Sequence, residues 1–60
     1  MRILVVDDTR LIREMVSAII RHEGYMPITA SGATEAVEIL DNDSIDLILM
    51  DVDMPEMDGF

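Results

Sequence analysis

Several residue types are missing from this chain of 60 residues, which has no cysteine, no tryptophan and no lysine. The absence of cysteine excludes disulfide bonds, thiol catalysis and zinc sites built on cysteine, and it is compatible with a reducing compartment. The single tyrosine and single phenylalanine carry no signal for stacking against nucleic-acid bases. Because lysine is absent, every basic side chain other than one histidine is an arginine.

Positive charge is scarce. Thirteen aspartates and glutamates stand against four arginines, which gives a formal net charge of -9. This balance makes direct binding of nucleic acid or of an anionic membrane by this segment unfavourable. We expect a cationic partner instead, and a divalent metal ion is one candidate.

Long apolar runs are also absent. No run reaches the roughly 18 to 20 residues that are needed to cross a bilayer, and residues 1–6 lack the pattern of a signal peptide. We therefore predict a soluble, cytoplasmic protein. Half of the residues are apolar, which indicates a folded chain, but a single domain of this size buries only about 60% of its unfolded surface and should be marginally stable.

Two kinds of apolar spacing alternate along the chain. Residues 2–6 and 45–50 are nearly all apolar, which is typical of strands covered on both faces in a parallel sheet. Residues 9–24 show helical spacing; we expect Asp8 or Thr9 to cap this helix and Gly24 to end it. The apolar stripe that should face the sheet consists of Ile12, Met15, Val16, Ile19 and Ile20.

The middle of the chain continues this alternation. Residues 25–29 include Pro27, which cannot donate to a strand ladder, so they are predicted to form an edge strand. Ser31 is expected to cap a second helix, which ends at residues 41–44 and whose apolar face comprises Ala33, Ala36, Val37 and Leu40. The order strand, helix, strand, helix, strand predicts an α/β fold with a parallel sheet and helices on both faces.

Acidic residues follow two of these strands directly. Asp7 and Asp8 follow the first strand, and Asp51 follows the third. Ligands of parallel sheets bind outside the carboxyl ends of the strands, where these carboxylates would meet and repel one another. Mg²⁺ would neutralise them, and a carboxylate left free beside it could attack phosphorus. The alternative interpretation is that these aspartates only end strands and cap helices.

The same residues resemble a known family. The sequence Val-Val-Asp-Asp at residues 5–8, followed by Leu-Met-Asp-Val-Asp-Met-Pro-Glu-Met-Asp-Gly at residues 49–59, is similar to the first half of the receiver domain of two-component response regulators. Gly32, Glu35 and Ala36 fit the same pattern. The resemblance covers all 60 residues and implies a flavodoxin-like doubly wound fold, in which this chain would supply the strand order 2-1-3.

The resemblance also implies roles for individual residues. Asp51 would be the phosphoacceptor for a histidine kinase or a phosphotransfer protein. Asp8 and Asp51 would bind Mg²⁺ through their carboxylates, Asp7 would act through a bound water, and Asp53 would contribute its backbone carbonyl. The implied function is a phosphorelay signalling module that catalyses its own phosphorylation and is not a turnover enzyme.

The chain departs from the family pattern after Phe60. Receiver domains have a Ser or Thr at the end of a fourth strand and a Lys at the end of a fifth, and this chain has neither strand and no lysine. We therefore interpret residues 1–60 as a partial receiver domain, truncated after the third strand and its loop, that switches poorly. The apolar third strand would then be an exposed edge that favours self-association.

Two other functions fit parts of this sequence. One is a receiver-like interaction or dimerisation module without phosphorylation. The other is a phosphatase of the haloacid dehalogenase type, because Asp51 and Asp53 resemble its Asp-x-Asp signature; that family has no use for Asp7 and Asp8, and Pro55 stands where it has Thr or Val. Arg10 and Arg13 could contact a phosphoryl group or a partner, but their spacing favours a solvated helix face. The position of His22 late in the same helix favours a simple role as a cation near the helix C-terminus.

Overall fold

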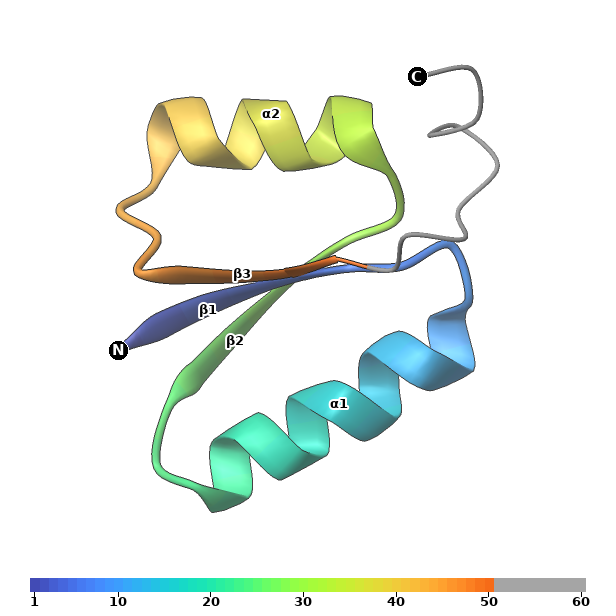
Figure 1. Ribbon diagram of the computed structural model, residues 1–60, viewed down its shortest axis with the longest axis vertical. Coiled ribbons are helices and arrows are strands. Elements are labelled where there is room, and N and C mark those ends of the chain that lie inside the picture. The colour runs from blue at the N-terminus through green and yellow to red at the C-terminus, as the bar shows by residue number, and fades with distance from the viewer. Residues whose placement is uncertain (51–60) are drawn as a thin grey trace.

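A three-stranded parallel sheet lies between two helices in the computed structural model, which describes residues 1–50 (Figure 1). The elements are β1 (Arg2–Val6), α1 (Arg10–His22), β2 (Met26–Ala30), α2 (Ala33–Asn42) and β3 (Leu47–Met50). Both neighbouring strand pairs are parallel, and the strand order is β2-β1-β3. The predicted α/β class and the predicted order 2-1-3 are confirmed. Neither α1 nor α2 is long and apolar enough to cross a membrane.

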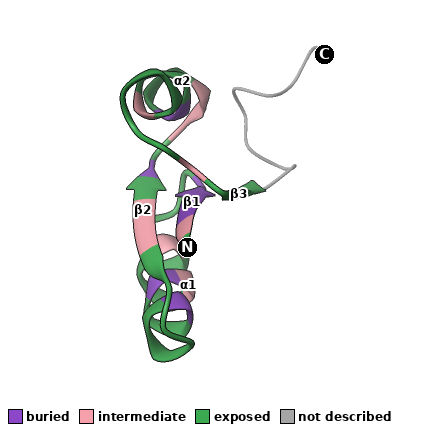
Figure 2. Cartoon of the chain, turned by 90° about the vertical axis from the view of Figure 1, so that its left-hand side faces the viewer, coloured by how far each residue is buried: buried purple, intermediate pink, exposed green. Residues whose placement is uncertain are grey.

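The central strand β1 divides its side chains between two cores. Successive residues of a strand point to opposite faces, and all four apolar residues of β1 are buried (Figure 2). The core beneath α2 consists of Leu4, Val6, Ala30 and Ala36. The core beneath α1 consists of Ile3, Val5 and Ile20, with Val16 packed against it. The prediction that this strand is covered on both faces is therefore correct.

Helix α1 faces the sheet with only part of its predicted apolar stripe. Val16 and Ile20 pack on the core, but Ile12, Met15 and Ile19 are 39%, 54% and 62% exposed, so the predicted buried stripe is partly wrong. The helix packs against β2 and β1, and a stripe wider than this contact leaves its outer residues in solvent. Ser17 lies outside the predicted apolar stripe, but it is buried, with an exposure of 5%.

Helix α2 also differs from its prediction in detail. Its N-cap is Gly32 rather than Ser31, and the backbone N–H of Ser31 donates to Glu35 Oε1 at 3.0 Å. Ala36 is buried and Ile39 packs against the core, whereas the predicted core residues Val37 and Leu40 are 56% and 42% exposed. The helix contacts β2 and β1, and these contacts cover only part of its predicted apolar face.

The two outer strands have different surroundings. β2 begins and ends one residue later than predicted, and its position at an edge of the sheet is confirmed. All four residues of β3, Leu47–Met50, are 40–47% exposed, so their apolar composition does not reflect cover on both faces within residues 1–50. The expectation of an exposed apolar third strand is confirmed for the part of the chain that the structure describes.

Leu4 provides a test of the central role of β1. Its side chain is fully buried, and Leu4→Ala should lower the free energy of unfolding by about 2–5 kcal/mol through lost burial and a residual cavity, enough to unfold a marginal domain. The control is Leu11→Ala, because Leu11 is 64% exposed on α1. Urea unfolding followed by circular dichroism measures both changes, and equal midpoints for the two variants would contradict the assignment.

Gly24 tests how α1 ends. Its φ of +88° lies in the left-handed region, and a Cβ added there would meet no atom within 4 Å. Gly24→Ala should therefore destabilise the fold by about 1–2 kcal/mol through backbone conformation alone, and Gly24→Asn should cost less because asparagine tolerates this region. Thermal unfolding of the three proteins checks the ranking. If Gly24→Asn lost as much stability as Gly24→Ala, the cause would not be the left-handed backbone conformation.

Candidate functional site

Asp7 is fixed at the carboxyl end of β1. Its side chain is buried, and its Oδ1 accepts a hydrogen bond from the backbone N–H of Thr9 at 2.8 Å. Its backbone N–H donates to the carbonyl of Ala30 at 3.2 Å, and its own carbonyl accepts from Arg13 Nη1 at 2.7 Å. The turn into α1 is therefore held by Asp7, whereas the predicted cap Thr9 occupies the N-cap position without a side-chain cap bond.

Asp8 has the opposite environment. It is exposed, and its Oδ1 accepts a hydrogen bond from Thr9 Oγ1 at 3.3 Å. An exposed carboxylate keeps its access to hydrated cations, while a buried and hydrogen-bonded one is restricted to the partners it already has. Two adjacent aspartates therefore present one positioned and one accessible carboxylate at the same edge of the sheet.

The strand register brings the third strand to this edge. Val6, the last residue of β1, pairs with Met50, the last residue of β3, and with Ala30 of β2. Asp7 follows Val6, and Asp51 follows Met50 in the sequence. Asp51 and Asp53, to which the sequence assigned the phosphoacceptor and a metal-binding carbonyl, lie outside the described residues, and these roles stay predictions.

The donor chemistry fits a magnesium ion in part. Within residues 1–50, no group of three or more His, Cys, Asp or Glu residues could hold a metal by itself. Asp7 and Asp8 contribute two carboxylates at the edge, and Mg²⁺ usually takes only one or two carboxylates together with water. The described residues can therefore supply part of a magnesium site, and any further protein ligands must come from the remaining residues.

Arg13 is a site residue that the sequence interpretation missed. It was assigned to a solvated helix face, but it is half-buried and its guanidinium holds the carbonyl of Asp7. The signal available in the sequence was its position one turn into the helix that starts beside the acidic pair. The helix-end interpretation of His22 fits its position in the last turn of α1, where its side chain is 87% exposed beside Glu23.

Other acidic residues are paired at the opposite end of the sheet. Asp46 Oδ2 accepts from the backbone N–H of Arg2 at 2.8 Å, and Asp43 Oδ1 lies 3.0 Å from Arg2 Nη2. These contacts join the start of β1 to the segment that leads into β3. These two carboxylates therefore have a structural role, which distinguishes them from the exposed carboxylate of Asp8.

The comparisons with known proteins agree with this architecture. The family described as "Response regulator receiver domain" matches residues 3–60. The chain is 40% identical to the two-component response regulator ARR12 of Arabidopsis thaliana, with 100% of this chain and 10% of that protein covered. It is 41% identical to the response regulator MprA of Mycobacterium avium, with 98% and 26% covered. It is 38% identical to the CAI-1 autoinducer sensor kinase/phosphatase CqsS of Vibrio cholerae, with 97% and 8% covered.

A solved structure has the same fold. The crystal structure of a response regulator receiver domain protein from Clostridium thermocellum superposes with a TM-score of 0.85 at 33% identity. The alignment covers 97% of this chain and 48% of that one, so the chain spans about half of the solved receiver and smaller parts of the curated relatives. With its strand order, its acidic pair and these matches together, the chain belongs to the response regulator receiver domain family of two-component signalling.

Proposed function

We propose that this chain is the part of a receiver domain that binds Mg²⁺ and accepts a phosphoryl group on Asp51 from a histidine kinase or a phosphotransfer protein. The observation that carries the proposal is the common edge of β1 and β3. Val6 and Met50, the last residues of β1 and β3, pair with each other, so the two strands end side by side. In the sequence each of these strands is followed directly by an aspartate. Consecutive Cα atoms are about 3.8 Å apart, which supports a convergence of Asp51 with the acidic pair.

The proposed chemistry divides between these carboxylates. Asp8 and Asp51 would hold Mg²⁺ through their carboxylates, Asp7 would act through a bound water, and Asp53 would contribute its backbone carbonyl. When bound, the ion offsets the negative charge that develops on the phosphoryl oxygens. A carboxylate oxygen of Asp51 forms the new bond to phosphorus while the phosphorus–nitrogen bond of the donor phosphohistidine breaks, and its electron pair returns to the imidazole, which takes up a proton.

Asp7 positions the edge for this reaction. Its contacts to Thr9, Ala30 and Arg13 tie the end of β1 to α1 and to β2. A rigid edge limits how far Asp8 can move, and a preorganised ligand set binds a metal with less loss of entropy. The burial of Asp7 and the exposure of Asp8 support their assignments as the water-linked and the direct ligand.

Residues 1–60 would act as a partial receiver domain in the cytoplasm. Receiver domains have a hydroxyl at the end of a fourth strand and a lysine at the end of a fifth, and residues 1–60 include neither strand, so we propose that these 60 residues on their own switch weakly. A second candidate function is self-association without phosphorylation, which the 40–47% exposure of the β3 side chains favours. Nothing in the family assignment supports the haloacid dehalogenase alternative.

Phosphorylation can be tested with acetyl phosphate as the donor. In the presence of Mg²⁺ the chain should gain one phosphoryl group, and Asp51→Asn should abolish the gain because an amide is not nucleophilic enough. Intact-mass spectrometry measures the adduct, and Asp41→Asn near the end of α2 serves as the matched control. An adduct that persists in Asp51→Asn, or sustained release of phosphate, contradicts the proposal. A chain that dimerises and never forms the adduct supports the second candidate.

The metal assignment predicts a ranking of two alanine variants. Asp8→Ala should weaken Mg²⁺ binding by about tenfold or more, because it removes a direct carboxylate ligand. Asp41→Ala removes an exposed carboxylate far from the strand ends and should leave the affinity nearly unchanged (Figure 1). Calorimetric titration with MgCl₂ measures both, and equal effects would count against Asp8 as a ligand.

A further inference from the structure

A hollow lies between α1 and the edge strand β2. It has a volume of about 480 Å³, within the range of small-molecule pockets. Its lining consists of Arg10, Arg13, Glu14, Ser17, Arg21 and Thr29. Three of the four arginines of the chain are in this set, although the chain as a whole carries a net charge of -9. We call this feature the arginine pocket.

The arginine pocket has a positive formal charge. Three guanidinium groups and one carboxylate give +2. Arg10 Nε lies 3.4 Å from Glu14 Oε1, and both side chains are mostly exposed, so this ion pair is weak and leaves Arg10 able to reorient. Arg13 uses Nη1 for the carbonyl of Asp7, and a guanidinium has five N–H donors. Arg10 and Arg13 therefore still have N–H donors that can bind an anion.

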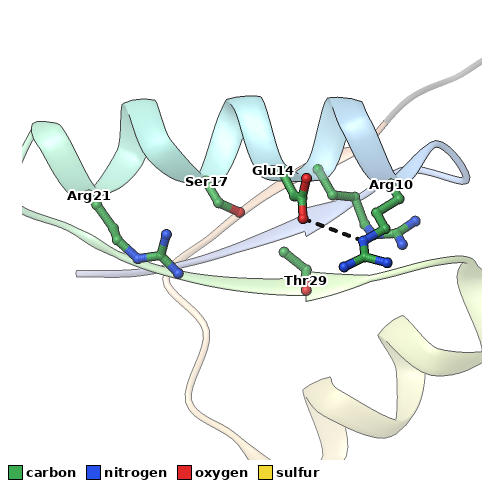
Figure 3. Close-up of a pocket in the computed structure, with 6 residues that line it drawn as sticks. Arg10, Glu14, Ser17, Arg21 and Thr29 are labelled. Atoms are coloured by element: carbon green, nitrogen blue, oxygen red, sulfur yellow. Dashed lines mark hydrogen bonds and ion pairs between the residues drawn. The ribbon is translucent and has the colours of Figure 1, made fainter.

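Ser17 gives an independent indication of a missing partner. Its side chain is buried, with a residue exposure of 5%, and its Oγ has no hydrogen-bond partner among the described residues. Leaving a buried hydroxyl unpaired is costly, and a ligand oxygen in the pocket would satisfy it. Figure 3 shows the Ser17 hydroxyl directed into the space between α1 and β2, with Thr29 on the strand side and Arg10 and Arg21 towards the two ends.

We propose that the arginine pocket binds an organic phosphate monoester, separately from the phosphoacceptor site. A phosphate monoester carries about -1.5 to -2 charges at neutral pH, which complements the +2 of the lining. Arginine forks pair with phosphate oxygens through two parallel hydrogen bonds. Arg10 and Arg13 are neighbours on the helix surface and bind the phosphate. Arg21, about 16 Å along the helix from Arg10, contacts the far end of the organic part.

Binding of a phosphate monoester to the arginine pocket can be tested by adding candidate ligands to the protein. The probes are glucose 6-phosphate for a free metabolite, a phosphoserine peptide for a modified partner, and glucose as the uncharged counterpart. We expect at least one phosphate probe to bind and glucose not to bind, with an affinity that falls as salt rises. Calorimetry or amide NMR shifts measure binding. Binding of either phosphate probe supports the proposal, binding of one alone also identifies the source, and binding of neither probe overturns it.

Matched arginine variants locate the binding. Arg10→Gln and Arg21→Gln combined should weaken phosphate binding by about tenfold or more, because two charge-assisted contacts are lost. The control is Arg2→Gln, since Arg2 is the one arginine outside the pocket and pairs with Asp43. Arg13 is left intact because it also holds Asp7. Circular dichroism verifies that each variant is folded, and an equal loss in Arg2→Gln overturns the assignment.

Ser17→Ala separates a ligand contact from a structural serine. If the hydroxyl binds the ligand, the variant should bind the phosphate probe about fivefold more weakly while its thermal stability is unchanged or higher, because an unpaired buried hydroxyl has been removed. A gain in stability with an unaltered affinity would show that Ser17 is only a packing residue and would overturn its place in the site.

Discussion

The burial of β1 on both of its faces is the constraint on which this structure depends. Ile3 and Val5 face α1, and Leu4 and Val6 face α2, so one short strand supplies side chains to both cores. Within residues 1–50 little other apolar surface is buried, because β3 and much of both helices are exposed. With β1 in the centre and β2 and β3 in parallel register beside it, the three strands end at one edge.

That edge is where we propose that the phosphoryl group is accepted. Asp7 and Asp8 follow β1 without an intervening residue, so their positions are tied to the most buried part of the fold. Asp7 is buried and Asp8 is exposed, and this difference supports our proposal that Asp7 positions the edge while Asp8 binds the metal ion. Arg13 links the carbonyl of Asp7 to α1, which makes the helix part of the support for the acidic edge.

Charge is distributed unevenly over the molecule. Arg2 pairs with Asp43 at the amino end of the sheet, and the other three arginines gather on the side of α1 that faces β2. The acidic pair lies at the carboxyl end of β1, where a cation is favoured, and the arginine pocket lies where an anion is favoured. A strongly acidic chain can therefore present surfaces of both signs, and net charge alone describes neither surface.

The sequence could predict the elements because their signals are local. The all-apolar run of residues 3–6, the proline of β2 and Gly24 depend on the chain itself and not on distant contacts, and each was assigned correctly. The predicted helix faces were partly wrong at Ile19 and Ser17 on α1 and at Val37 on α2. Periodicity identifies an apolar side of a helix, but the area of sheet available to it decides which residues are covered.

The sequence by itself determined the α/β alternation and the family, because these depend on residue type and spacing along one chain. Only the tertiary structure decided that Asp7 is buried while Asp8 is exposed, that Arg13 binds the Asp7 carbonyl, and that three arginines meet an unpaired serine beside β2. The physical reason is that burial and pairing are properties of surfaces brought together by folding, and the rotation of a helix on a sheet depends on the packing of every side chain between them.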